Sequence, residues 1–284
     1  MPTQSQTWFE EAYEIDLGRT FKIRINRTVE RFASPFQTIE ILETAPFGKM
    51  LVLDGVVMCT EWDESSYHEM IAHVPLSTHP APRDVLIIGG GDGGTAREVL
   101  KHDSVRRIDL CEIDPDVVRL CRKHLPTLAS SFDDPRVTVY AEDGAAFVAA
   151  RPNEYDVIIV DSSDPIGPAE VLFSKQFYTA LRSGLREDGI AVTQSESIFY
   201  HEGTVAQLVS YARSLFPVWG YYTTMVPTYP SGTIGFTLCS KGRNPVTGFD
   251  RERTAAFADT LSYYTPKMHT ASFSLPARVE RRLS

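Results

Sequence analysis

The chain has 284 residues, 43% of them hydrophobic and 23% charged, which is enough apolar material for a globular core. Its formal net charge of −9 argues against a nucleic-acid binder, because such proteins usually carry a basic footprint. Four scattered cysteines without a C-x-x-C pair argue against a zinc ribbon or a disulfide framework, and we expect them to be small buried hydrophobes.

No secretory signal is visible at the N-terminus. The first fifteen residues lack a basic region and an apolar region, and no apolar run approaches the roughly 18–20 residues of a membrane span. We therefore expect a cytoplasmic protein. The basic residues Arg278, Arg281 and Arg282 near the end are expected to form a solvated helix face.

Residues 1–60 are predicted to form a small N-terminal antiparallel β-domain. Strands are expected at residues 21–25, 38–42 and 50–57. In these segments apolar residues, including β-branched ones, either alternate with polar residues or form a continuous run. Within the last segment, Asp54-Gly55 predicts a hairpin turn.

The remaining residues, 61–284, are predicted to form the larger, catalytic domain. Apolar side chains at helical spacing predict a connecting helix at residues 63–79, which ends before the breaker at residues 80–82 and lines the site. Strands then alternate with helices, which predicts an open parallel α/β sheet with crossover helices. The expected strands are residues 84–90, 106–113, 136–143, 155–163 and 189–197, followed by an antiparallel edge pair at 219–226 and 233–240.

A glycine-rich loop at residues 89–94 follows the first of these strands and opens a helix. Glycines let the backbone turn tightly and approach a ligand beside the helix N-terminus. About twenty residues on, Glu112 ends the next strand, where a carboxylate can accept hydrogen bonds from both ribose hydroxyls. The alternative for Glu112 is a part in capping the helix that starts at Asp114.

Asp92 stands inside this loop and argues against a pyrophosphate ligand, because like charges repel at close range. An adenosyl sulfonium compound fits the loop better than a dinucleotide. Asp143 and Gly144 follow the third strand, where the carboxylate can accept from an adenine amine. The alternative for Asp143 is a helix N-cap.

The fourth strand ends in DSSDPIGP, residues 161–168. The carboxyl ends of parallel strands line the ligand crevice, so Asp161 and Asp164 are expected to face it together with Asp92 and Asp143. Crowded carboxylates need cations, and the residue spacing contains no recognisable metal set, which favours an organic dication. The alternative is a loop with an Asx turn and a helix cap.

These blocks, with LVLDGVVMCTEWDESSYHEMIAHVPL (51–76), PTYPSG (227–232) and MHTASFSLP (268–276), resemble the spermidine synthase family from about residue 8 to residue 276. The resemblance implies a Rossmann-like, methyltransferase-type sheet behind the N-terminal β-domain, assembled as a homodimer or homotetramer. It implies aminopropyl transfer from decarboxylated S-adenosylmethionine, a co-substrate, to putrescine, with no cofactor and no metal.

The resemblance also implies roles for particular residues. Gln37 and Glu112 would bind the ribose, and Asp143, Gly144 and Pro168 would surround the adenine. Asp92 and His68 would contact the transferred aminopropyl amine, and Asp161 would be the proton acceptor. The amine acceptor would be held by the residues Tyr67, Ser162, Ser163, Asp164 and Tyr229.

Three positions depart from many relatives: Met58 replaces a polar Gln, Trp62 replaces a basic residue, and His68 replaces a Gln. They leave other acceptors open, namely cadaverine, agmatine or spermidine. Two further alternatives are an S-adenosylmethionine-dependent putrescine N-methyltransferase and a catalytically silent nucleoside- or polyamine-binding protein. Asp92 argues against the methyl donor, whose carboxylate it would repel.

Overall fold

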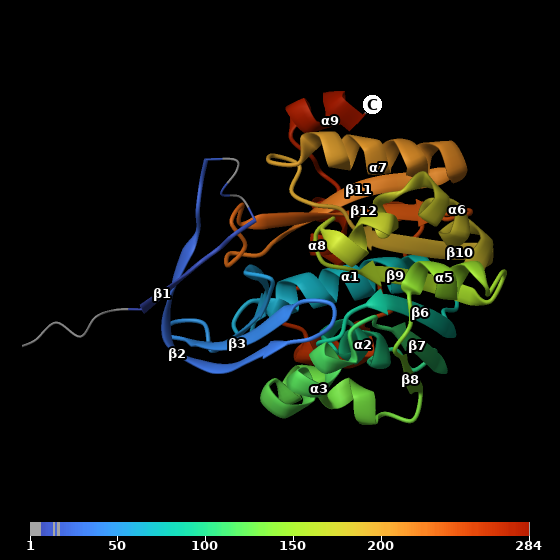
Figure 1. Ribbon diagram of the computed structural model, residues 1–284. Coiled ribbons are helices and arrows are strands. Elements are labelled where there is room, and N and C mark those ends of the chain that lie inside the picture. Colours follow the sequence, from blue (N-terminus) through green and yellow to red (C-terminus); the bar gives the residue numbers. More distant parts are fainter. Residues whose placement is uncertain (1–6, 14, 16–17, 284) are drawn as a thin grey trace, which may run out of the picture.

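The computed structural model describes residues 7–13, 15 and 18–283 and contains two β-sheets (Figure 1). A five-stranded antiparallel sheet comes first in the chain, and a seven-stranded, mostly parallel sheet with helices on both faces follows. The predicted α/β class is therefore confirmed. The proposed division of the chain after residue 60 falls between these two parts, and residues 1–6 of the first part lie outside the described residues.

The first sheet is a meander with strand order β1-β2-β3-β4-β5. The Asp54-Gly55 turn is confirmed: both residues have positive φ angles, 49° and 81°, as this two-residue hairpin between β4 and β5 requires. The strand predicted at residues 21–25 covers only the start of a longer strand, and the first strand was not predicted. The bounds are β1 Thr7–Glu10, β2 Lys22–Ala33, β3 Thr38–Thr44, β4 Lys49–Leu53 and β5 Val56–Thr60.

The second sheet has the order β11-β12-β10-β9-β6-β7-β8. The five predicted central strands are parallel, and β12 pairs antiparallel with both β10 and β11, as expected for the edge pair. The predicted strand at residues 189–197 differs, since the observed strand begins earlier and ends at Gln194. The bounds are β6 Asp84–Gly89, β7 Arg107–Cys111, β8 Val137–Tyr140, β9 Tyr155–Asp161, β10 Leu185–Gln194, β11 Val218–Met225 and β12 Thr233–Ser240.

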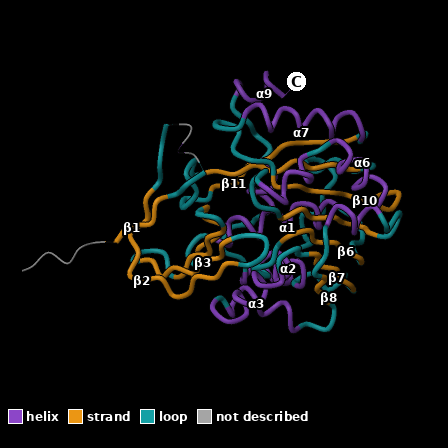
Figure 2. Tube along the Cα trace, viewed as in Figure 1, coloured by secondary structure: helices purple, strands orange, loops and turns teal. Residues whose placement is uncertain are grey.

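Helices cover both faces of this sheet (Figure 2). The helices α1, α2 and α3 share a buried cluster with Val157 and Ile159 of β9, whereas α5, α6 and α7 share another with Ile158 and Val160. A strand buried on both faces is a continuous apolar run, because its side chains alternate between the two layers. The bounds are α1 Glu64–Thr78, α2 Gly94–Leu100, α3 Pro115–His124, α4 Pro126–Ala129, α5 Gly144–Ala149, α6 Lys175–Gly184, α7 Glu202–Leu215, α8 Pro266–Ser272 and α9 Ala277–Leu283.

The strand order places a crevice at the centre of the sheet. From β6 the chain runs outward through β7 and β8 and then returns to the other side of β6 as β9. Ligands bind at such reversal points, outside the carboxyl ends of the strands. Within the described residues, no helix has the length and apolar character needed to cross a membrane.

Candidate active site

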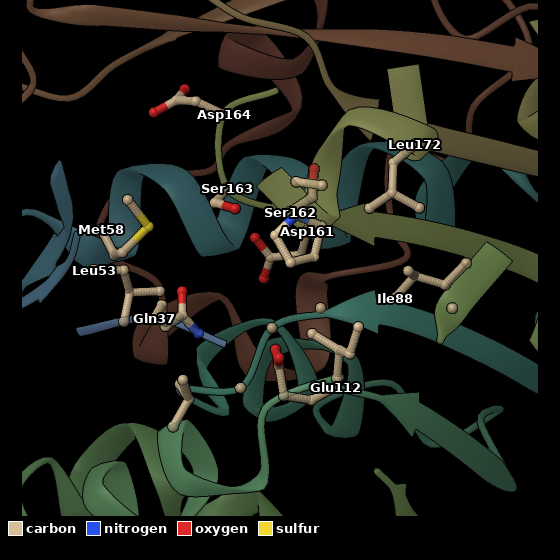
Figure 3. A pocket seen from close by; sticks show the side chains of 18 of the residues that line it. Gln37, Leu53, Met58, Ile88, Glu112, Asp161, Ser162, Ser163, Asp164 and Leu172 are labelled. Atoms are coloured by element: carbon tan, nitrogen blue, oxygen red, sulfur yellow. The ribbon is translucent and has the colours of Figure 1, made fainter. Parts of the chain in front are cut away.

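A cavity of about 260 Å³ lies between the first sheet and the carboxyl ends of β6, β7 and β9. Figure 3 shows Asp161 at its centre, Glu112 on one side and Asp164 at the far end of the loop. Every residue predicted for the site lines this cavity. They are Gln37, Tyr67, His68, Asp92, Glu112, Asp143, Gly144, Asp161, Ser162, Ser163, Asp164, Pro168 and Tyr229.

Gly89 brings the two central loops together. Its φ of +80° is in the left-handed region, and a Cβ there would lie 2.1 Å from the backbone oxygen of Asp161. Next to it, the Gly90 amide donates to that same oxygen at 2.9 Å. The glycine-rich loop is therefore pressed against the end of β9, which puts Asp161 beside the loop that carries Asp92.

Glu112 contacts the start of α3 and also lines the cavity. Its Oε1 accepts from the Asp114 amide at 2.9 Å, at the start of α3, and the side chain also lines the cavity. Gln37 from the first sheet donates to Asp114 Oδ2 at 3.0 Å. Burial raises the pKa of Glu112 to about 7, although the Asp114 amide opposes the shift. A desolvated carboxylate that lacks a cation is ready to accept hydrogen bonds from a ligand.

Asp143 is an N-cap, as the alternative for it predicted. Its Oδ1 accepts from the amides of Ala145 and Ala146 at 2.8 and 3.0 Å. The carboxylate still lines the cavity, next to Gly144. Capping thus fixes its position without removing it from the site.

Asp92 is paired with a cation. Its Oδ1 accepts from the Gly94 amide at 2.6 Å and lies 3.4 Å from His68 Nε2. Burial would raise the pKa of Asp92, but the charge of His68 and the hydrogen bonds from His68 and the Gly94 amide together outweigh burial and hold the pKa below its usual range. Burial likewise opposes protonation of His68, but Asp92 and Glu64 raise its pKa well above the ordinary value. The pair is therefore a carboxylate and an imidazolium.

Asp161 has a different environment, although it ends the neighbouring strand. Tyr67 donates to its Oδ1 at 2.8 Å, and Thr95 donates to its Oδ2 at 2.6 Å. Burial and the charge of Asp92 raise its pKa, against the opposing effect of His68. Two acids in one cavity thus have opposite shifts, which is the arrangement that separates a proton acceptor from a permanent anion.

A second, smaller cavity of about 60 Å³ continues from the first and shares Asp164, Tyr67 and Tyr229 with it. Glu11 and Glu196 also line it. Burial and these two carboxylates raise the pKa of Asp164 well above its usual range. This end of the site therefore gathers acidic side chains, among which Asp164 favours its protonated form, and His201 Nδ1 lies 2.9 Å from Glu196 Oε2.

Polar hydroxyls border this acidic end. Tyr229 donates to the Met58 carbonyl at 2.6 Å, which leaves the tyrosine oxygen able to accept. Its loop is tied to the start of α1, because Asp63 accepts from the backbone amide of Thr228 at 2.9 Å and also from its hydroxyl. Within the described part of the chain, the buried Ser162 hydroxyl has no hydrogen-bond partner, which leaves it for a ligand.

The sequence analysis missed several residues of the site. Gln194 and Glu196 lie at the carboxyl end of β10 and line the second cavity, and the strand-end rule that found Asp161 could have found them. Thr95 was assigned only to a helix, and Glu11 precedes any predicted strand. Nothing in the sequence marked those two residues.

One position that departs from many relatives lies outside the site. Trp62, which left the choice of amine open, lines neither cavity, is 56% exposed and packs against Phe47 at 5.1 Å between ring centroids. Met58, by contrast, lines both cavities. The reason is that Trp62 follows β5 on the outer side of the turn into α1, whereas Met58 lies inside the strand.

The metal prediction stays a prediction. Among residues 7–13, 15 and 18–283, no group of three or more His, Cys, Asp or Glu side chains is arranged to hold a metal ion. The arrangement provides a nucleoside-sized cavity, a neutralised carboxylate, a carboxyl group with a raised pKa, and an acidic extension. Together these can bind an adenosyl compound next to an amine and remove a proton from it.

Known proteins match this chain over nearly its whole length. The profile described as "Spermine/spermidine synthase domain" matches residues 64–249, and the "Spermidine synthase tetramerisation domain" matches residues 7–61. A polyamine aminopropyltransferase of Leptospira biflexa is 48% identical, covering 95% of this chain and 96% of the relative. The spermidine synthase of Dictyostelium discoideum is 42% identical, covering 98% and 97%.

Solved structures agree with these matches. A crystal structure of spermidine synthase in complex with the transition-state analogue AdoDATO has a TM-score of 0.95 at 42% identity and covers 100% of this chain and 96% of that one. The spermidine synthase of Thermotoga maritima gives a TM-score of 0.94 at 42% identity, covering 99% and 95%. The Rossmann-like fold expected from the sequence is thereby confirmed.

Proposed function

The chain belongs to the spermidine synthase family of polyamine aminopropyltransferases, and from this we propose that it converts decarboxylated S-adenosylmethionine and putrescine into spermidine and 5'-methylthioadenosine. The observation that carries this proposal is the pair Asp92 and Asp161, two acids in one cavity whose pKa values are shifted in opposite directions. One has the properties of an anchor for a cation, and the other those of a proton acceptor.

The donor would occupy the larger cavity. Glu112 would accept from the ribose hydroxyls, with Gln37 beside it, and Asp143 and Gly144 would face the adenine near Pro168. Asp92 would receive the ammonium of the aminopropyl group. Ordinary S-adenosylmethionine carries a carboxylate on the same carbon, which Asp92 would repel.

The acceptor would extend from Asp161 into the acidic second cavity. A diamine is a dication near neutral pH, since its amines resemble that of lysine with a pKa of about 10.4. Its distal ammonium would lie among Asp164, Glu11 and Glu196, where its charge relieves the repulsion between the acids. Tyr229 and the hydroxyls of Ser162 and Ser163 would accept hydrogen bonds along the way.

The reaction would then need one proton transfer and one displacement. Asp161, whose raised pKa suits a base for an amine, takes a proton from the attacking nitrogen. The freed lone pair forms a bond to the carbon attached to sulfur. The C–S bond breaks with its electron pair going to sulfur, so the leaving group is neutral methylthioadenosine. We propose that no cofactor takes part, and that the remaining work is in-line positioning of the two substrates.

Product analysis tests the proposal. The purified protein is incubated with decarboxylated S-adenosylmethionine and, in parallel, with putrescine, cadaverine, agmatine or spermidine. We expect spermidine and methylthioadenosine in equal amounts from putrescine and much less product from the other amines. Turnover with another amine alone would contradict the acceptor, and methylation by S-adenosylmethionine would contradict the reaction.

We also propose that the chain assembles as a homodimer or homotetramer. The support is the match of residues 7–61 to a tetramerisation domain, which covers the whole first sheet. Size-exclusion chromatography with light scattering on the purified protein tests this. A mass of 31.7 kDa, that of one chain, at micromolar concentration would contradict it.

A further inference from the structure

A chain of buried polar contacts runs from the Asp92 carboxylate to the far side of α1. His68 Nε2 lies 3.4 Å from Asp92, and its other ring nitrogen, Nδ1, lies 2.6 Å from Glu64 Oε2. The same Glu64 oxygen accepts from Arg97 Nη2 at 2.8 Å, and Arg97 Nε donates to Glu98 at 2.8 Å. Two helices, α1 and α2, thus meet through alternating charges behind the cavity.

This chain of contacts is shielded from water. The side chains of His68 and Glu64 are 2% and 11% exposed, and that of Arg97 is 22% exposed. Asp92 and His68 line the cavity, while Glu64 and Arg97 do not. Removing one member of a buried charge series leaves the neighbouring charge without its partner. A change at Glu64 or Arg97 should therefore alter the position of His68 at the cavity wall.

Packing fixes the imidazole from a second direction. A Cβ at Gly94, the first residue of α2, would lie 2.3–2.7 Å from three atoms of the His68 ring. The ring therefore lies flat on the helix start, between Glu64 and Asp92. Displacing it in either direction would break one of its two polar contacts.

The charges that face His68 come from three elements. Glu64 lies on the same helix, Asp92 on the loop after β6, and Asp161 at the end of β9, while Arg97 lies behind Glu64. Burial disfavours the imidazolium, and the carboxylates of Asp92 and Glu64 outweigh it, so the pKa of His68 is raised. With both ring nitrogens protonated, His68 can donate to Glu64 and Asp92 at once.

We propose that Glu64 and Arg97 are positioning residues for the ammonium of the aminopropyl donor. Arg97 orients Glu64, Glu64 holds His68 with Nε2 toward Asp92, and His68 with the Gly94 amide occupies Asp92 Oδ1. Within the described residues, Oδ2 makes no hydrogen bond, so it is presented to the donor ammonium. The inference rests on the proposed function, because it takes the decarboxylated donor as the ligand.

Two ligands separate this role from general damage to the cavity. Decarboxylated S-adenosylmethionine carries the ammonium, whereas methylthioadenosine has the same nucleoside without the aminopropyl group. Isothermal titration calorimetry would measure the Kd of each for the wild type, Glu64→Gln and Arg97→Gln. We expect a roughly 10-fold weaker Kd for the decarboxylated donor and an unchanged Kd for methylthioadenosine.

A matched control lies on the same helix. Lys101 pairs with Glu98 at 2.7 Å, so Lys101→Gln removes a charge at the end of the series farthest from the cavity and leaves the contacts between Arg97, Glu64 and His68 in place. We expect wild-type Kd values for both ligands in this variant. An equal loss of affinity for both ligands in Glu64→Gln, or no loss for either, would overturn the positioning role.

The substrate-free protein gives an independent readout. In ¹⁵N-histidine spectra, with His68→Gln for assignment, we expect the wild-type His68 ring to keep both protons to a higher pH than a free imidazole, because its pKa is raised. In Glu64→Gln the ring should lose a proton at a lower pH than in the wild type. Glu64→Gln should also add nothing to the donor Kd in a His68→Gln background, because its effect passes through His68.

The remaining outcomes are also decisive. If Glu64→Gln does not fold, Gly94→Ala serves instead, because it leaves Glu64 and Arg97 in place and pushes the His68 imidazole away. We expect Gly94→Ala to weaken the Kd of the decarboxylated donor and to leave that of methylthioadenosine unchanged. An unchanged donor Kd in this variant would overturn the proposal. A wild type that binds methylthioadenosine but not the decarboxylated donor would contradict the proposed function instead. The histidine spectra would then still decide whether Glu64 holds His68.

Discussion

The loops after β6 and β9 both present acids to the same cavity, but their surroundings differ. The first loop carries Asp92, which has an imidazolium beside it and a pKa below its usual range. The second carries Asp161 and Asp164, whose neighbours include other acids and whose pKa values are raised. A carboxylate that has a cation beside it in the fold stays ionised and can bind a further cation. Carboxyl groups without such a neighbour favour protonation or the binding of a cationic ligand.

Under the proposed function, this difference would give the two loops separate tasks. On the β6 side, charge is balanced before any ligand arrives, which suits a fixed anchor for one ammonium. On the β9 side, the raised pKa of Asp161 suits reversible proton transfer, and the acidic extension beyond it suits a dication. Substitutions that remove the carboxylate from one loop or from the other should therefore impair different steps of the reaction.

The largest effect is expected from Asp161→Asn. The amide cannot take the proton of the attacking amine, so we expect kcat to fall about 10³-fold while the donor Kd stays within 3-fold. Steady-state assay of methylthioadenosine release and calorimetry with the donor measure the two quantities. Asp116→Asn, a half-buried position on α3 that lines neither cavity, serves as a control, and wild-type turnover in Asp161→Asn would refute the base assignment.

Asp92→Asn should mainly affect the donor. Losing the carboxylate removes the partner of the donor ammonium and leaves Glu64 as the one carboxylate that contacts His68 among the described residues, so we expect a donor KM about 100-fold higher. Discrimination against S-adenosylmethionine should weaken as well, because its carboxylate is no longer repelled. Competition calorimetry with both compounds measures this, and unaltered discrimination would contradict the proposed role of Asp92.

Glu112→Gln should have opposite effects on binding and stability. The folded-state pKa is raised from 4.5 to about 7, so the ionised side chain destabilises the fold above pH 7, and this penalty disappears below about pH 4.5. The difference corresponds to at most about 3 kcal/mol. We expect Glu112→Gln to have a higher Tm than the wild type at pH 8, with the gap closing toward pH 5.

The same substitution should weaken donor binding about 10-fold at pH 8, because glutamine offers one acceptor where the carboxylate offers two. Thermal unfolding at both pH values and donor calorimetry provide the comparison. A lower Tm at pH 8 would mean that the Glu112 carboxylate is better compensated in the fold than its surroundings indicate.

The smallest effects concern acceptor choice. Met58 lines both cavities and its carbonyl accepts from Tyr229, so Met58→Gln should change the ratio of putrescine to cadaverine turnover by about 2- to 5-fold. Trp62 lies outside both cavities, and Trp62→Arg should leave the ratio unchanged. Competition assays with the two amines decide this, and a larger shift from Trp62→Arg would place the specificity determinant in the β5–α1 turn.

Sequence patterns were informative where local chemistry dictates structure. Asp54-Gly55 supplies the positive φ angles of a tight hairpin, and the apolar runs of β6 and β9 are long enough only for buried strands. The rule that parallel strand ends line the crevice then placed Asp92, Glu112 and Asp161 in one cavity. These inferences need only neighbouring residues and the order of strands.

Contacts between segments distant in the chain could not be predicted in this way. Glu11 and Glu196 line one cavity across 185 residues, and Arg97 reaches Glu64 across 33. The position of Trp62 outside both cavities could not be predicted either, because Met58, four residues earlier, indicates nothing about which way the turn after β5 faces. Such placements depend on tertiary packing, which no local spacing encodes.

The most direct test is a rapid-quench single-turnover experiment with putrescine and saturating decarboxylated S-adenosylmethionine, comparing the wild type with Asp92→Asn and Asp161→Asn. If the two loops have separate tasks, saturating donor restores the rate of Asp92→Asn to within about 10-fold of the wild type. The rate of Asp161→Asn stays about 10³-fold lower at every donor concentration. Equal losses in the two variants at saturating donor would contradict the division of labour between the loops.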